Sequence, residues 1–231
     1  MPFSEHQPCY CSTKMQIYDC LHWKRNSRVL ISHLVMETST GAGLNDCLTT
    51  PVFLDWCRGM MIGEPVQESF KTLQDLKRVF HDSSALSKLD PSREIYRVRW
   101  WSPANPGTEG GLFWGLTMLQ PGKVSDEYFM THGHSHANGT RAEFYGTVSG
   151  NGMLIQMNTE RRVWGEIMAP GSLHYVRGEN AHRIANTGSI PLIVWACWPT
   201  DAGYDYEPIA DQGFSARLVE RDGKPVFIAA E

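Results

Sequence analysis

The chain has 231 residues, of which 42% are hydrophobic and 20% are charged, and its formal net charge is -4 at pH 7. This length and balance predict one well-buried domain with a modest appendage, and a slightly acidic chain lacks the broad positive field that attracts nucleic acid. The sequence contains no run of about 18 or more apolar residues, so we expect no membrane span, no nucleic-acid partner and a cytoplasmic location.

The first 50 residues show no sustained hydrophobic period, and they contain a Thr/Ser/Gly stretch, 38–43, that is typical of a linker. We therefore predict a poorly ordered tail over residues 1–50 and one domain over residues 51–231. A non-native start is a further hypothesis, with Met36 as the true first residue, and the intact mass of the native protein would test it. The six cysteines gather toward the N-terminus without an export signal, so reduced thiols are expected.

The first regular element is expected after Thr72, where apolar residues recur at helical spacing. Thr72 is placed to cap a short amphipathic helix, and a second turn of helix is predicted over residues 84–89, with Pro91 ending it. The apolar positions of the first helix would share one face: Leu73, Leu76, Val79 and Phe80.

From residue 95 onward the hydrophobic period changes to two, which indicates β-strands. Turn signals such as Pro121-Gly122 separate most of the runs. Many short strands without helices between them predict an all-β fold, an antiparallel sandwich or barrel, of which the jelly-roll cupin is one kind. The predicted strands cover residues 95–101, 112–119, 127–131, 142–149, 152–157, 162–168, 173–176, 182–186 and 192–198.

Three histidines and a glutamate within this β-rich region form a candidate metal site. Residues two apart on a strand share a face, so His134 and His136 can present their imidazoles to one point. Glu143 can return on the neighbouring strand, and His182 supplies a fourth ligand. Each histidine alone could be a surface or hydrogen-bonded core residue, but the four ligands together suit iron, manganese, nickel, cobalt or zinc.

The spacing His-x-His-x6-Glu-x38-His, together with its flanking segments, resembles the cupin-type, archaeal-type glucose-6-phosphate isomerases. The likeness covers about residues 51–230 and implies a cupin double-stranded β-helix, a jelly-roll barrel with a short N-terminal helical segment. The segments that carry it lie in family order: Leu116–Lys123, Thr131–His136, Ala169–Val176, Ala181–Gly188 and Trp198–Tyr206.

The resemblance implies a metal-dependent isomerase that interconverts glucose 6-phosphate and fructose 6-phosphate, through an enediolate or a metal-assisted hydride shift. It further implies one divalent transition metal, iron before manganese, nickel, zinc or cobalt. A small sugar phosphate as substrate, a homodimer, and a place in glycolysis and gluconeogenesis are also expected from it.

The resemblance also implies roles for individual residues. Glu143 is expected to move the proton between C2 and C1, with a purely metal-binding role as the alternative. Tyr145 lies two positions on and is expected either to orient a substrate oxygen or to pack within the barrel. Thr117, Thr131 and Gly133 match positions that contact the phosphate in the family.

Two positions depart from the family, which has tyrosine where Trp198 stands and histidine where Tyr204 stands. An indole accepts no hydrogen bond, and a phenol with a pKa of about 10 transfers protons less readily at neutral pH. Mannose 6-phosphate is therefore an alternative substrate. A cupin dioxygenase and a metal-dependent sugar-phosphate-binding protein without turnover are alternative functions. Arg141 is expected on the cavity face, paired with a phosphate or a neighbouring acid.

Overall fold

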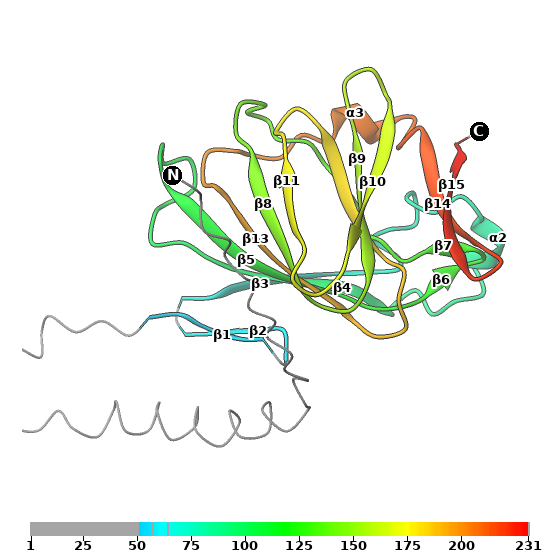
Figure 1. Ribbon diagram of the computed structural model, residues 1–231, viewed down its shortest axis with the longest axis horizontal. Helices are drawn as coiled ribbons and strands as arrows, with labels where there is room; N and C mark the ends of the chain where they lie inside the picture. Colours follow the sequence, from blue (N-terminus) through cyan, green and yellow to red (C-terminus); the bar gives the residue numbers. More distant parts are fainter. Residues whose placement is uncertain (1–50, 57, 64, 231) are drawn as a thin grey trace, which may run out of the picture. The chain divides into compact units, whose positions relative to one another are not determined.

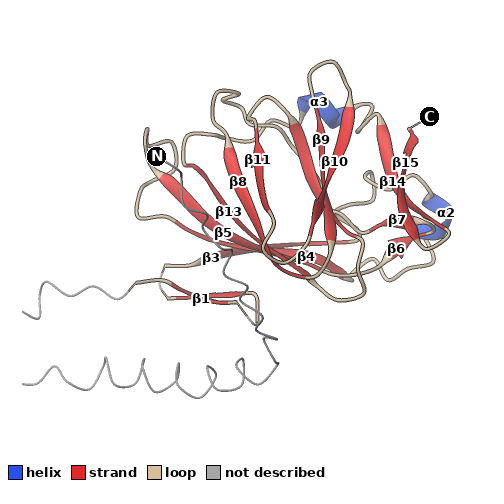
Figure 2. Ribbon diagram, viewed as in Figure 1, coloured by secondary structure: helices blue, strands red, loops and turns tan. Residues whose placement is uncertain are grey.

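The computed structural model describes residues 51–230 apart from residues 57 and 64, and strands make up almost all of its regular elements (Figure 2). The tail predicted over residues 1–50, with its candidate start at Met36, lies outside the described residues. Among the described residues, no helix is long and apolar enough to cross a membrane.

The strands form four antiparallel sheets (Figure 1). The largest has the order β11-β8-β13-β5-β4-β3, the second β10-β9-β12, the third β15-β14-β7-β6, and β1 pairs with β2. The strands are β1 (Phe53–Asp55), β2 (Met60–Ile62), β3 (Gln67–Thr72), β4 (Glu94–Trp101), β5 (Leu112–Leu119), β6 (Lys123–Val124), β7 (Glu127–Tyr128), β8 (Glu143–Ser149), β9 (Gly152–Met157), β10 (Val163–Met168), β11 (Leu173–Val176), β12 (Ala181–Asn186), β13 (Leu192–Pro199), β14 (Ala216–Arg221) and β15 (Lys224–Ala229), and the helices are α2 (Ser83–Leu86) and α3 (Glu207–Ala210).

The chain alternates between the two main sheets from β8 to β13. Strand β8 lies in the six-stranded sheet, β9 and β10 lie in the three-stranded sheet, β11 returns to the first, β12 to the second, and β13 to the first. This alternation is the winding of a jelly roll. It confirms the expected all-β, cupin-type barrel.

The core lies between these two sheets because alternate residues of each strand face the other sheet. Leu119 and Val194 of the six-stranded sheet and Leu154 and Ile184 of the three-stranded sheet belong to one buried cluster. Each such side chain contributes about 1.5–3 kcal/mol through its removal from water. The inward face therefore provides a rigid frame for any polar groups placed among these residues.

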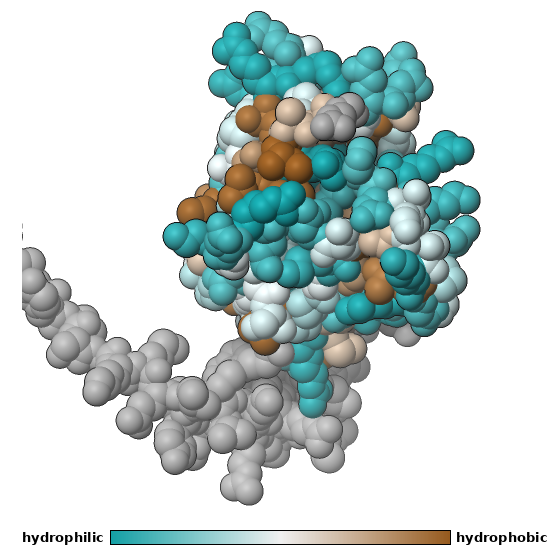
Figure 3. Space-filling model, turned by 90° about the vertical axis from the view of Figure 1, so that its right-hand side faces the viewer, coloured by the Kyte–Doolittle hydropathy of each residue, from teal (hydrophilic) through white to brown (hydrophobic). Residues whose placement is uncertain are grey.

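The C-terminal hairpin β14–β15 was not predicted, and it covers the other face of the three-stranded sheet. Phe214 and Leu218 join the main core, and a Cβ on Gly165 of β10 would lie 2.8 Å from the ring of Phe227. Figure 3 looks at the side of the molecule that carries this hairpin and shows a mostly hydrophilic surface with small hydrophobic areas. Strand β12 is consequently buried along its whole length.

The helix predicted after Thr72 is wrong, since residues 73–79 form consecutive turns. Leu73 and Gln74 donate their backbone N–H groups to the carbonyls of Arg93 and Pro91, at 2.9 and 3.0 Å. These two hydrogen bonds hold the segment against residues 91–93. The chain then forms turns, in which Leu76 N donates to Leu73 O at 3.2 Å. The predicted apolar face is buried nonetheless.

Thr72 does not cap a helix either, because its N–H and hydroxyl both donate to the Asp75 carboxylate, at 2.7 and 2.9 Å. The second predicted helical turn is present as α2, whose first turn is capped by Asp82. The short helical segment expected before the barrel is therefore this single four-residue helix.

Candidate metal centre

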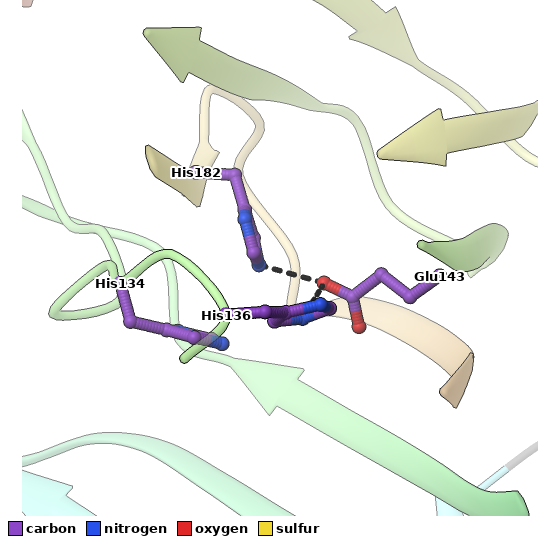
Figure 4. A group of neighbouring side chains, drawn as sticks. All are labelled: His134, His136, Glu143 and His182. Carbon is purple, nitrogen blue, oxygen red and sulfur yellow. Dashed lines mark ion pairs between the residues drawn. The ribbon is translucent and has the colours of Figure 1, made fainter. Parts of the chain in front are cut away.

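Four side chains from separate elements converge in the barrel: His134 and His136 from the segment between β7 and β8, Glu143 from the start of β8, and His182 from β12 (Figure 4). One ligand atom from each of the four lies within 4.8 Å of the others. His134 exchanges backbone hydrogen bonds with His182, at 3.1 and 2.8 Å. The sequence analysis placed both histidines on a strand, but neither lies on a regular strand. The isolated bridge between His134 and His182 holds this segment against β12.

The Glu143 carboxylate is the centre of the group. Its Oε1 lies 2.6 Å from His182 Nε2 and 3.5 Å from His136 Nε2. Burial by itself would raise the pKa of Glu143, but His182 and His136, when they carry a second proton, outweigh that effect and hold the pKa far below its ordinary value. Burial lowers the pKa of His134, and the nearby His182 adds to the shift. The site therefore favours an anionic carboxylate and neutral His134.

Backbone carbonyls determine which imidazole nitrogens face Glu143. His182 Nδ1 lies 3.0 Å from the carbonyl of Asn180, and His136 Nδ1 contacts the carbonyl of Arg141. A carbonyl only accepts hydrogen bonds, so both Nδ1 atoms carry the proton in neutral imidazole, and both Nε2 atoms turn lone pairs toward the carboxylate.

Lone pairs that converge on a carboxylate repel it unless a cation or a proton lies between them. Within the described part of the chain, Glu143 Oε1 and His182 Nε2 are buried without a hydrogen-bond donor. A divalent metal would satisfy both atoms, and carbonyl-bound Nδ1–H groups are the usual support for imidazole ligands. The donor set of three imidazoles and one carboxylate thus fits a transition metal with open coordination positions.

The centre opens into a cavity of about 380 Å³, a size suited to a small organic ligand. The four residues that were predicted to contact the substrate all line this cavity: Thr117, Thr131, Gly133 and Tyr145. Tyr145 is partly buried, and burial together with the Glu143 charge raises the pKa of its hydroxyl. Tyr145 is therefore a neutral hydrogen-bonding group at neutral pH.

Gly133 has a backbone conformation that a side chain would strain. Its φ is +87°, and a Cβ there would lie 3.1 Å from the Phe214 ring and 3.2 Å from the His182 carbonyl. Glycine therefore allows the 131–134 segment to pass close to β12. On the same segment, the Thr131 hydroxyl accepts a hydrogen bond from Ile184 N at 3.1 Å and keeps its own proton available.

The two positions that depart from the family also line the cavity. Trp198 packs against Phe113 with ring centroids 5.3 Å apart, and its ring occupies the space that a Cβ on Gly115 would need. The Tyr204 ring lies 4.8 Å from the His134 ring, and burial raises the pKa of its hydroxyl to about 12. Both residues therefore present neutral aromatic surfaces to a ligand.

Arg141 pairs with an acid, the second of its two predicted partners. Its guanidinium binds Asp201 through two atoms, Nε at 2.9 Å and Nη2 at 2.7 Å from Oδ2, and it does not line the cavity. This pair fixes the loop whose carbonyl orients His136.

Several cavity residues were not predicted, and two of them lie on β3, a strand that was missed. Ser69 and Lys71 of β3, Tyr96 and Trp100 of β4, and Tyr206 all line the cavity. The alternation of Gln67–Thr72 could have indicated a strand, since Phe70 lies between polar neighbours.

A second cluster of histidine and glutamate lies between β8, β10 and β11. His174 Nδ1 lies 2.9 Å from Glu166 Oε2, and its Nε2 lies 2.9 Å from Ser172 Oγ. Gln156 donates to Glu166 Oε1 at 2.7 Å and accepts from Asn180 at 3.2 Å. His174 is thus a buried hydrogen-bonded residue.

The chain is similar to known isomerases over most of its length. The family model described as "Glucose-6-phosphate isomerase (GPI)" matches residues 70–227. The glucose-6-phosphate isomerase of Thermococcus litoralis is 38% identical over 175 residues, covering 76% of this chain and 91% of the relative. That of Thermococcus kodakarensis is 39% identical over 158 residues, covering 67% and 81%. A protein of Rhizobium meliloti named putative glucose-6-phosphate isomerase 2 is 36% identical over 156 residues.

Among solved structures, oxalate decarboxylase from Bacillus subtilis is similar at 20% identity with a TM-score of 0.38. The match covers 48% of this chain and spans about a quarter, 26%, of that structure's chain. So distant a likeness carries no information about the reaction.

Proposed function

We propose that this chain, which belongs to the glucose-6-phosphate isomerase family, interconverts glucose 6-phosphate and fructose 6-phosphate. The proposed reaction depends on a bound metal. The observation that carries the proposal is the convergence of His134, His136, Glu143 and His182 on one point of the cavity. The family model spans all four of these residues.

These four side chains would hold the ion, and the carbonyls of Arg141 and Asn180 would keep two of the imidazole rings in place. A divalent metal bound there would polarise the sugar carbonyl and stabilise the charge of an enediolate as C2 loses its proton. Glu143 would carry that proton between C2 and C1 on its carboxylate, because it is the one acid that lines the cavity among the described residues. A hydride shift between the same carbons is the alternative route.

The remaining cavity residues would orient the substrate. Tyr145, whose hydroxyl stays protonated, would donate a hydrogen bond to a sugar oxygen. Thr117, Thr131 and the backbone N–H of Gly133 would bind the phosphate as neutral donors. In this arrangement the reacting carbons would lie beside Glu143.

Trp198 and Tyr204 bear on which sugar phosphate is preferred. Both present aromatic surface beside the metal centre, and Tyr204 is unsuited to proton transfer at neutral pH because its pKa is about 12. Mannose 6-phosphate is therefore the first alternative substrate to compare. Iron as the native metal and a homodimeric assembly stay predictions from the family resemblance, to be tested by metal analysis and by the mass in solution.

The central experiment measures conversion of fructose 6-phosphate to glucose 6-phosphate before and after chelation, with each divalent metal then added back. We expect activity to vanish on chelation and to return with one of the ions. Glu143→Gln should lower kcat by about 10²- to 10⁴-fold, the usual contribution of a positioned acid–base group. Glu166→Gln, a carboxylate change in the second histidine–glutamate cluster, is the matched control and should keep wild-type activity.

Two results would contradict the proposal. Metal-loaded protein that binds fructose 6-phosphate without converting it would favour a sugar-phosphate-binding protein. Oxygen uptake by the iron-loaded protein in place of isomerisation would favour a cupin dioxygenase.

A further inference from the structure

Lys71 is an exposed residue on the edge strand of the six-stranded sheet, and it lines the mouth of the cavity. The alternate residues of β3 face outward, where Glu68 pairs with Arg99 at 2.6 Å and Phe70 lies 5.2 Å under the guanidinium of Arg97. Successive residues of a strand point to opposite faces, so Ser69 and Lys71 face the cavity, and both line it. A register shift follows directly at Lys71/Thr72, where β3 leaves the regular ladder.

The register places Lys71 beside the expected phosphate donors. Lys71 pairs with Tyr96, and the neighbouring row of the same sheet runs from Ser69 through Val98 to Thr117. Tyr96 and His132 both line the cavity, and His132 lies between Thr131 and Gly133 in the chain. Lys71 therefore lies along the wall that the Thr and Gly donors also form.

Two cationic side chains line the cavity among the described residues, Lys71 and Arg183. The guanidinium of Arg183 stacks 3.7 Å from the Phe214 ring and donates from Nη1 to Met130 Sδ at 3.0 Å, which directs it toward these two side chains although its buried Nε has no partner. Lys71 makes no ion pair within the described part of the chain. It is thus the cation that is free to bind an anion in this cavity.

A sugar phosphate carries a charge of about -1.5 to -2 at neutral pH, and hydroxyl and backbone donors alone leave that charge uncompensated. We propose that Lys71 is a substrate-binding residue whose ammonium group pairs with the phosphate held by Thr117, Thr131 and Gly133. This inference rests on the proposed function, and it adds a charged contact from β3 to the neutral donors there. Such a contact is made equally in ground and transition states, so it acts on KM rather than on kcat.

The test compares Lys71→Met and Lys71→Arg with the wild type. Lys77→Met is the matched control, because Lys77 is exposed on the turn after β3 and does not line the cavity. We expect Lys71→Met to raise KM for fructose 6-phosphate by about 10- to 100-fold, as for the loss of one charged hydrogen bond, with kcat and metal content unchanged. Lys71→Arg should restore most of the affinity, and Lys77→Met should behave as wild type.

Calorimetric titration with inorganic phosphate supplies a readout that does not depend on turnover. Weaker phosphate binding by Lys71→Met than by Lys77→Met would support the pairing of Lys71 with phosphate. This result would stand even if the wild-type protein isomerised neither glucose 6-phosphate nor mannose 6-phosphate. Such a lack of isomerisation would contradict only the proposed function. Equal KM and equal phosphate affinity in Lys71→Met and the wild type would overturn the inference and make Lys71 a solvated edge-strand lysine.

Discussion

The barrel contains two histidine–glutamate clusters that share residue types but differ in the exposure of the carboxylate, 35% for Glu166 and 4% for Glu143, and in the direction of their lone pairs. In the cluster of His174, Glu166 and Ser172, both imidazole nitrogens and both carboxylate oxygens have hydrogen-bond partners. In the cluster around Glu143, the backbone carbonyls take the Nδ1 protons of His136 and His182, and the Nε2 atoms face the carboxylate without a donor between them.

The two clusters are neighbours, since Tyr145 of the metal centre pairs across β8 and β11 with His174. Asn180 joins them, because its carbonyl accepts from His182 and its side chain donates to Gln156. A buried polar cluster whose partners are all present strengthens the packing, whereas one with converging unpaired acceptors calls for a cation. The difference lies in the backbone carbonyls around each imidazole, and composition alone would not reveal it.

The largest expected effect comes from removing a ligand. His182→Gln should lose more than about 100-fold in metal affinity and a comparable share of isomerase activity, because even the loss of an outer partner costs 10–100-fold. Metal content after dialysis, with activity measured in parallel, tests this. Retention of stoichiometric metal by His182→Gln would contradict the assignment of the centre.

The matched change in the other cluster should separate stability from chemistry. His174→Gln leaves Glu166 or Ser172 without its partner, so the free energy of unfolding should fall by about 1–3 kcal/mol. Metal content and kcat should stay at wild-type values. Urea unfolding with metal analysis of the same samples measures both, and a loss of metal from His174→Gln would show that the clusters are not independent.

The smallest effect concerns Glu127, which is 3% exposed, and whose charged neighbours are Arg217 at 3.9 Å, Arg183 and His81. Burial raises its pKa above the ordinary value of 4.5, although His81 N donates to it at 3.1 Å. The folded state therefore prefers the protonated form, and wild-type stability declines as pH rises from the unfolded pKa through the raised folded pKa. Glu127→Gln should remove this decline.

Unfolding midpoints from about pH 4 to pH 8 measure the effect. The stability of Glu127→Gln relative to the wild type should increase with pH across that window. A stability difference that does not change with pH would show that the pKa of Glu127 is not raised in the folded state.

Strands were predictable wherever the hydrophobic period was strong and both ends carried turn residues. The spans 112–119, 152–157 and 173–176 were predicted with the bounds that β5, β9 and β11 have. Strands β3, β14 and β15 were missed because their exposed, charged residues mask the period of two. The helix after Thr72 failed because its backbone donors bond to residues 91–93, a contact that no local pattern contains.

The sequence by itself determined the all-β class and the set of four candidate ligands, because both depend on residue type and spacing. Only the tertiary structure decided that Arg141 pairs with Asp201, that Lys71 faces the cavity, and that two imidazoles turn their Nε2 atoms toward Glu143. Those features depend on which backbone segment lies beside each side chain. Strand register and loop closure set those neighbours over separations of many residues, beyond the reach of a local pattern.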